Sequence, residues 1–352
     1  MPGLESFLHA LPKVELHVHL LGAVRQHTFE ALARAARAPL PDEEIAAFYT
    51  RGDKPVGVLR VLRALDRWLL RRPDDLHRIA YEYLQDAATH RVRWSEIFWN
   101  PTGTARDGGI AYPQALAAIV RAMHDARADF GIESCLVPAI DRVGSAAEAI
   151  EMVGWVVAHR VDEVAGIGID YREVDRPPEL FADAFALARR HGLRTTAHAG
   201  EFGMPWTNVR TAVELLQVDR IDHGYTVVDS PEFAARCAER GIVFTVVPTN
   251  SYYLRTLPRE RWALDHPIRR MPSLGLRIHP NTDDPTLHHV TPTGAWLMMA
   301  RDFGFDTAAL RGFMDNGIAA AWTDDDTKAR WRAEFGTAFD ALAREHLQGS
   351  PP

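Results

Sequence analysis

Short apolar runs alternate with segments of helical periodicity along most of the chain. Eight of these runs have strand length and β-branched content, which predicts β-strands. They cover roughly Lys13–Leu20, Val92–Asn100, Ile132–Ile140, Val164–Asp170, Arg194–Gly200, Arg220–Gly224, Val243–Thr249 and Leu276–Asp284. Helical patterns separate most of them, over Tyr112–Ala128, Ala146–Arg160, Pro178–His191 and Pro231–Arg240. Eight strands that alternate with helices predict an α/β protein, a (β/α)8 or TIM barrel.

Two stretches are longer than a minimal strand–helix unit needs. The first is residues 21–91, with helical patterns over Thr28–Arg37 and Val56–Arg71. The second follows the eighth strand and carries helix-like segments up to about His346. No internal repeat or low-complexity linker divides the chain, so we predict one domain over residues 1–352. That domain has a helical lid insertion at about 21–91 and extra C-terminal helices.

Composition narrows the class of protein. The 352 residues are 47% hydrophobic and 25% charged, as in ordinary globular proteins. The net charge of −7 argues against binding to nucleic acid or anionic membranes. We see no secretory signal and no membrane-spanning apolar run, and the two cysteines exclude a disulfide framework or a cysteine zinc site. A cytoplasmic enzyme with a small-molecule substrate is expected; the sequence does not predict an oligomeric state.

Polar residues fall at the carboxyl ends of the predicted strands, the face on which barrel enzymes hold their active sites. His17 and His19 form an H-V-H pair in the first strand, and because side chains alternate along a strand, both imidazoles point into the barrel. At the end of the fifth strand, in H-A-G-E, His198 is a third candidate ligand and Glu201 a candidate acid or base.

Two further strands end in groups of the same kind. His223 ends the sixth strand in I-D-H-G, and Asp283 and Asp284 end the eighth in N-T-D-D-P. Taken singly, each has an ordinary alternative, a hydrogen-bonded buried histidine or a carboxylate in a turn. Adjacent buried carboxylates, however, need a cation or a donor.

Together these residues favour a metal-dependent hydrolase. A mixed nitrogen and oxygen set suits zinc and leaves room for a water whose pKa falls to about 7. Glu201 and His223 would flank that water as proton carriers. The set that would bind zinc is His17, His19, His198 and one of the adjacent aspartates Asp283 and Asp284.

Several motifs are absent. The fourth strand ends in G-I-D-Y-R, without the modified lysine that commonly bridges two metals, so one zinc per chain is predicted. The H-E-x-x-H motif, the P-C-x-x-C motif of small zinc deaminases and the glycine-rich phosphate loops are absent too.

The motifs P-K-V-E-L-H-V-H-L, T-A-H-A-G-E, D-H-G and N-T-D-D-P, in this order, resemble the adenosine deaminase family of the amidohydrolase superfamily. The resemblance implies a zinc barrel that replaces the 6-amino group of an adenine ring with an oxo group and releases ammonia. It implies that His17, His19, His198 and Asp283 are the zinc ligands. It implies that Glu201 protonates ring N1, with a raised pKa, and that His223 deprotonates the water. Asp284 would face N7, and Leu62 and Leu65 would belong to an apolar lid, although their spacing is equally that of an ordinary amphipathic helix.

Two departures concern the substrate. The family's acidic residue that meets the ribose 5′-hydroxyl is replaced by Leu21, and a glycine beside the purine is replaced by Glu173. We therefore expect an adenine nucleoside-type substrate. One alternative is a 5′-modified nucleoside such as aminodeoxyfutalosine of menaquinone biosynthesis, whose carboxylate Arg25 or Arg172 would pair. Free adenine, N6-substituted adenine, another mononuclear zinc amidohydrolase activity and a non-catalytic protein are further alternatives.

Overall fold

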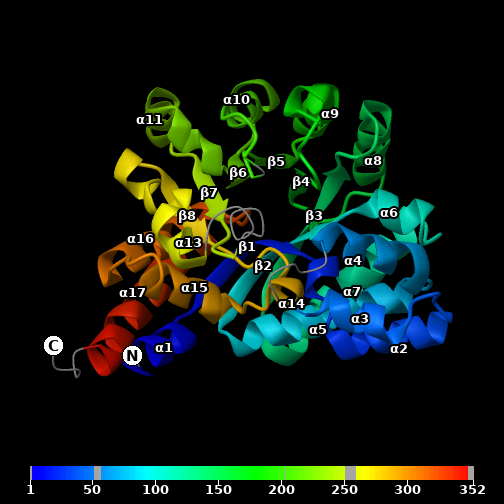
Figure 1. The fold of residues 1–352 in the computed structure, drawn as a ribbon, viewed down its shortest axis with the longest axis horizontal. Helices are drawn as coiled ribbons and strands as arrows, with labels where there is room; N and C mark the ends of the chain where they lie inside the picture. The colour runs from blue at the N-terminus through cyan, green and yellow to red at the C-terminus, as the bar shows by residue number, and fades with distance from the viewer. Residues whose placement is uncertain (1, 51–56, 202, 250–258, 348–352) are drawn as a thin grey trace.

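Eight parallel strands form the centre of the molecule in this computed structural model, and helices surround them (Figure 1). The structure describes residues 2–50, 57–201, 203–249 and 259–347. The strands pair in chain order. They are β1 Lys13–His19, β2 Val92–Trp99, β3 Glu133–Asp141, β4 Gly166–Asp170, β5 Arg194–Ala199, β6 Arg220–His223, β7 Val243–Val246 and β8 Arg277–Pro280. This order confirms the predicted (β/α)8 barrel.

The sheet closes through residues just beyond β8. Val18 forms a parallel bridge with Asp283, the backbone N–H of His19 donates to the Asp283 carbonyl at 2.8 Å, and the N–H of Asp283 donates to the His17 carbonyl at 3.0 Å. The prediction of a strand over Leu276–Asp284 was therefore too long. Asp283 has φ +65°, outside the extended region, so its backbone turns where a strand would continue.

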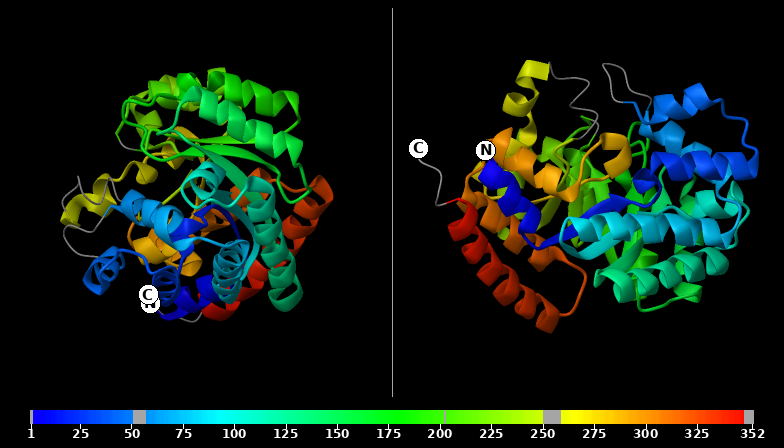
Figure 2. Two further views of the ribbon diagram at one scale, coloured as in Figure 1. Left: turned by 90° about the vertical axis from the view of Figure 1, so that its right-hand side faces the viewer. Right: turned by 90° about the horizontal axis from the view of Figure 1, so that it is seen from below.

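The helices that follow the strands lie outside the sheet, as the two views of Figure 2 show. Between β2 and β7 they are α6 Pro101–Arg106, α7 Tyr112–Phe130, α8 Ala146–Ala158, η3 Pro178–Phe181, α9 Ala182–Arg190, α10 Thr207–Thr211, η4 Ala212–Leu216, η5 Tyr225–Asp229 and α11 Pro231–Glu239. The predicted helix over Pro178–His191 thus begins as the 3-10 turn η3.

The stretch between β1 and β2 is helical, as predicted. It contains η1 Leu21–Ala23, α2 Gln26–Ala36, α3 Asp42–Phe48, α4 Val58–Ala64, η2 Leu65–Leu69 and α5 Pro73–Thr89. The single helix predicted over Val56–Arg71 is divided into α4 and the π-helical turn η2. Val56, where that prediction began, lies outside the described residues. Such π turns often occur next to functional sites.

The C-terminal helices pack against the N-terminal one. Between β7 and β8 lie α13 Arg259–Asp265, η6 Pro267–Arg269 and η7 Pro272–Leu274, and after β8 lie α14 Pro285–His288, α15 Pro292–Arg301, α16 Thr307–Ala320 and α17 Asp325–His346. The N-terminal helix α1 Pro2–Ala10 and α17 lie at one side of the molecule in Figures 1 and 2, and the rings of Phe7 in α1 and Phe339 in α17 meet edge to face at 5.1 Å. In the described part of the chain, no helix combines the length and apolarity that crossing a bilayer requires.

The barrel interior below the carboxyl ends is polar as well as apolar. The guanidinium of Arg220 lies 2.5 Å from the carboxylate of Glu96, and both side chains are buried. Arg220 also lies over the Trp322 ring at 4.3 Å and donates to the Leu16 carbonyl at 3.0 Å. The two buried charges pair with each other, so neither is left uncompensated beneath the site.

Candidate metal centre and catalytic cavity

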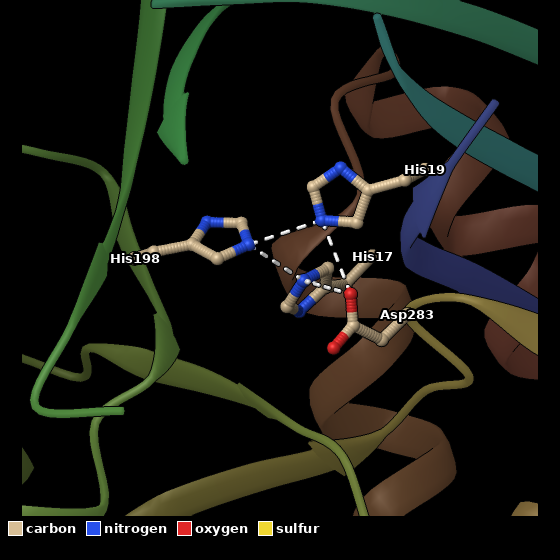
Figure 3. Close-up of side chains that lie close together, drawn as sticks. All are labelled: His17, His19, His198 and Asp283. Atoms are coloured by element: carbon tan, nitrogen blue, oxygen red, sulfur yellow. Dashed lines mark hydrogen bonds and ion pairs between the residues drawn. The ribbon is translucent and has the colours of Figure 1, made fainter. Parts of the chain in front are cut away.

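Three imidazoles and one carboxylate converge at the carboxyl end of the barrel (Figure 3). The Nε2 atom of His198 lies 3.0 Å from that of His17 and 3.2 Å from that of His19. The Asp283 Oδ1 atom lies 3.1 Å from His19 Nε2 and 3.6 Å from His17 Nε2. The four predicted ligands, which come from β1, β5 and the segment after β8, are therefore brought together, and they could hold a metal ion.

The outer nitrogen of each imidazole faces an acceptor. Nδ1 of His17 lies 3.3 Å from the Thr245 carbonyl oxygen, Nδ1 of His19 lies 3.4 Å from Asp170 Oδ2, and Nδ1 of His198 lies 3.3 Å from Asp222 Oδ2. An acceptor at Nδ1 places the proton there and leaves the Nε2 lone pair directed inward. With their protons on Nδ1, all three imidazoles would face one centre with Nε2 as an electron-pair donor.

Burial and neighbouring charges set the protonation of this cluster. Burial, assisted by the nearby His198, lowers the pKa of His17 to about 4, so this imidazole is neutral at pH 7. For Asp222, burial alone would raise the pKa, but the hydrogen bond with His198 and the nearby His17 and Arg220 hold it below its usual range. Asp222 is therefore a buried carboxylate anion, a strong acceptor for His198.

Glu201 and His223 lie beside the cluster, as predicted. His223 Nε2 is 3.6 Å from Glu201 Oε2. These two side chains and Asp283 lie close enough together to offer ligand atoms to one metal ion. The chain reaches Glu201 through Gly200, which has φ +68° and whose added Cβ would lie 2.5 Å from the Thr226 hydroxyl. Glycine is therefore required in H-A-G-E to turn the acidic residue into the site.

Tyr225 defines the tautomer of His223. Its hydroxyl donates to the Val247 carbonyl at 3.0 Å, accepts the Val247 N–H at 3.0 Å and lies 3.2 Å from His223 Nδ1. A phenolic hydroxyl has one proton and two lone pairs, so the remaining lone pair accepts from a protonated Nδ1. Burial also lowers the pKa of His223 well below its usual value. His223 is therefore neutral with a free Nε2, the form that a general base needs.

A cavity of about 460 Å³ opens next to the cluster. Of the predicted substrate-binding residues, Asp284, Leu62 and Arg172 line it, and Leu62 comes from α4 of the insertion. Asp284 packs so closely on Gly22 that an added Cβ there would lie 1.7 Å from its Oδ1. The glycine of H-L-L-G thus makes room for the second aspartate of N-T-D-D-P. The predicted raised pKa of Glu201 stays a prediction.

Three residues proposed for substrate contacts lie elsewhere. Leu21 and Leu65 are 4% and 0% exposed in the hydrophobic core, where leaving water stabilises an apolar side chain, and neither is among the described residues that line the cavity. The idea that Arg25 pairs with a substrate carboxylate was wrong. Its guanidinium is bound by Asp86 of α5 at 2.6 Å and by Gln85 at 2.8 Å.

Several residues of the site were not predicted. Asp170 and Asp222 hold two of the imidazoles, His288 lines the cavity 3.9 Å from Asp284, and Glu173 accepts hydrogen bonds from the turn before Glu201. A signal for Asp222 was present, because its strand is adjacent to that of His198 and the two residues are paired in register. Knowledge of the register would have placed them on one face of the sheet.

The fold and this site together define a metal-dependent hydrolase of the barrel type. The family model for adenosine deaminase matches residues 12–337. An adenine deaminase from Rhodospirillum rubrum is 34% identical over 94% of this chain and 97% of its own length.

Two solved structures are similar throughout. An amidohydrolase from Burkholderia ambifaria, crystallised with bound zinc, has a TM-score of 0.98 and 66% identity, covering 99% of this chain and 96% of its own. The adenine deaminase from Arthrobacter aurescens has a TM-score of 0.84 and 29% identity, covering 93% and 98%. The chain belongs to the adenosine deaminase family, and it is a hydrolytic deaminase that acts on carbon–nitrogen bonds.

Proposed function

We propose that this protein catalyses the hydrolytic deamination of a 6-aminopurine at a single zinc site, with free adenine as its substrate. The reaction consumes water and yields hypoxanthine and ammonia. The observation that carries the proposal is the convergence of three imidazole nitrogens and one carboxylate oxygen beside Glu201, His223 and an open cavity.

The ligand atoms fit zinc in kind and in spacing. Two atoms that each bind one zinc ion at about 2.1 Å lie no more than about 4.2 Å apart. The distances within the cluster are 3.0, 3.1, 3.2 and 3.6 Å. His17, His19, His198 and Asp283 would hold the ion, which when bound supplies Lewis acidity and activates water at neutral pH.

The remaining residues would move protons and orient the purine. His223 would take a proton from the attacking water at Nε2, the nitrogen that Tyr225 leaves free. Glu201, as the neutral acid, would donate a proton to ring N1 and make C6 electrophilic. Asp284, on the cavity wall, would face N7 and fix the ring in the orientation that presents C6.

Two findings support the free base over the nucleoside that the sequence favoured. The relatives named adenine deaminase extend over nearly the whole chain. In addition, position 21, where the family's 5′-hydroxyl contact is expected, holds a leucine that is buried in the core. A buried leucine cannot accept a hydrogen bond from a ribose, so nothing at this position rewards a nucleoside.

The test is a comparison of kcat/KM for ammonia release from adenine and adenosine by the zinc-loaded protein. We expect adenine to be preferred by about 100-fold or more, the factor that a missing hydroxyl contact can produce. Preference for adenosine would refute the free-base assignment. Zinc-loaded protein that is inert toward every 6-aminopurine would refute the proposed function and favour another amidohydrolase reaction.

A 5′-modified adenine nucleoside is the second candidate, because Arg172 lines the cavity and is exposed. A guanidinium at this wall can pair with an anionic group on a substrate tail. Aminodeoxyfutalosine belongs in the same assay. A higher kcat/KM for this compound than for adenine, lost in Arg172→Gln, would favour the second candidate.

A further inference from the structure

The turn after β5 carries two groups on which the proposed reaction depends. His198, at the end of the strand, contributes a ligand atom, and Glu201, three residues later, provides the acid. The intervening Gly200 has a left-handed backbone, which makes the turn tight. The position of the Glu201 carboxyl therefore depends on what holds this short piece of backbone.

Glu173, from the loop after β4, binds the backbone of this turn through its carboxylate. Its Oε1 accepts the N–H of Gly200 at 3.0 Å, and its Oε2 accepts the N–H of Glu201 at 3.3 Å. The Asn208 side chain, at the start of α10, donates to Oε1 at 2.8 Å. Glu173 itself is only 1% exposed. Hydrogen bonds to a buried anion are stronger than those to a neutral acceptor, so the carboxylate orders two consecutive peptide groups.

The neighbours of Glu173 in sequence face a different way. Arg172 and Val174 both line the cavity, whereas Glu173 between them binds the turn. The sequence placed Glu173 where the family has a glycine that approaches the purine. In the structure its carboxylate accepts hydrogen bonds from the backbone N–H groups of Gly200 and Glu201 instead of lining the cavity.

Arg142, directly after β3, also binds this segment. Its Nη2 donates to the His198 carbonyl at 2.5 Å, and its side chain is fully buried. Burial lowers the pKa of Arg142, while the charges of Glu173, Asp170 and Glu201 oppose that effect. The cation thus shares its buried surroundings with the carboxylates around the turn, which stabilises an otherwise costly set of charges.

We propose that Glu173 is a positioning residue for deamination, which fixes the backbone of Gly200 and Glu201 so that the Glu201 carboxyl meets the substrate ring. This inference rests on the proposed function, because it assigns the acid to Glu201. A displacement of about 1 Å in a reacting group can cost about 100-fold in rate. Glu173 is not a ligand and does not touch the reacting atoms, so substrate binding and metal content should not depend on it.

The test uses Glu173→Gln in the zinc-loaded protein. Glutamine has the same shape, but its amide NH2 must face one of the two backbone N–H donors, and the negative charge is gone. We expect kcat to fall by about 10- to 100-fold, with KM within about threefold and zinc content unchanged. Glu179→Gln, at an exposed residue of the following turn η3, is the matched control and should behave as the unmodified protein.

A double-mutant cycle identifies the residue through which Glu173 acts. If Glu173 serves Glu201, then Glu173→Gln costs no further activity in a Glu201→Gln background. Equal losses in both backgrounds would overturn the proposal, as would an unchanged kcat. A parallel fall in zinc content would also overturn it, because Glu173 would then support the metal cluster.

Hydrogen exchange tests the positioning without activity. The amides of Gly200 and Glu201 should exchange at least tenfold faster in Glu173→Gln than in Glu179→Gln, and unchanged exchange would refute the contact. Glu173→Asp, which keeps the charge but shortens the side chain, should give an intermediate result and replaces the glutamine variant if that variant does not fold. Loss of the proposed function itself is distinguishable, because the unmodified protein would then be inactive on 6-aminopurines while the exchange result would stand.

Discussion

Replacing Asp222 by asparagine should weaken zinc binding without touching a ligand. Asp222 is fully buried, and its Oδ2 lies 3.3 Å from Nδ1 of His198. The hydroxyls of Thr196 and Thr245 donate to the same carboxylate at 2.9 and 2.7 Å. The Asp222 carboxylate therefore accepts three hydrogen bonds, from the His198 imidazole and from two threonine hydroxyls. An asparagine has only one oxygen with which to receive them.

The cost follows from this donor count. If the new NH2 group faces His198, two donors oppose each other, and the imidazole must move its proton to Nε2, where it blocks the metal. Losing a hydrogen bond to a charged partner costs about 1.5–3 kcal/mol. That range corresponds to a rise of about 10- to 150-fold in the zinc dissociation constant, close to the 10- to 100-fold known for such supporting residues.

The assay is competition for zinc against a chromophoric chelator at pH 7.5. Asp229→Asn, an exposed residue of η5, is the control and should bind zinc as the unmodified protein does. Asp170→Asn should give a loss of similar size, because Asp170 Oδ2 supports His19 at 3.4 Å. A zinc dissociation constant within about threefold of the original, in a folded Asp222→Asn protein, would refute the reasoning.

Three further predictions concern the acid, a ligand and a buried carboxyl. Glu201→Gln should lose at least about 100-fold in kcat for ammonia release, since the proton donor to N1 is gone. Metal analysis of the same variant should show unchanged zinc content. Asp283→Ala should lower zinc occupancy after dialysis, because it removes one of four ligand atoms. Burial raises the pKa of Asp66 from 3.8 to about 7. The neutral acid therefore stabilises the folded state below pH 4, and this contribution is lost as the pH rises through 7. The charged groups that face Asp66 are Arg63, Asp107 and Asp141. Asp66→Asn should raise the free energy of unfolding at pH 8.5 relative to pH 4.5 by up to about 3 kcal/mol, whereas the exposed Asp74→Asn should change it little. An equal effect of Asp66→Asn at both pH values would contradict the assigned pKa.

The strands and the ligand set were predictable because both depend on local pattern. Apolar runs locate the strands, and the carboxyl ends of parallel strands lie on one face, so His17, His198 and Asp283 could be grouped from sequence alone. The strand ends were less predictable. β8 ends at Pro280 and Asp283 has a left-handed backbone, and no periodicity in the sequence indicates either feature.

The supporting contacts were not predictable, because they join residues whose pairing depends on tertiary structure. Asp222 serves His198 only through the register of β5 and β6, and Glu173 reaches Gly200 from another loop. Leu21 and Leu65, which the sequence placed in the substrate pocket, pack in the core instead, and the sequence could not predict this either. An apolar residue near an active site can line the cavity or pack in the core, and its sequence does not distinguish the two outcomes.

The interior of the barrel explains why the reaction was easier to predict than the substrate. The ligand atoms come from strands or from the bridge that closes the sheet, and the acceptors behind His17 and His198, Thr245 and Asp222, are strand residues too. Strand positions are held rigidly, which is what a metal site requires. The cavity is completed by loop and insertion residues such as Leu62 and Arg172, where the chain tolerates change without disturbing that inner set. On the proposed function, the strand motifs of this chain would carry the deamination, and the loops outside those motifs would discriminate between adenine and its nucleosides.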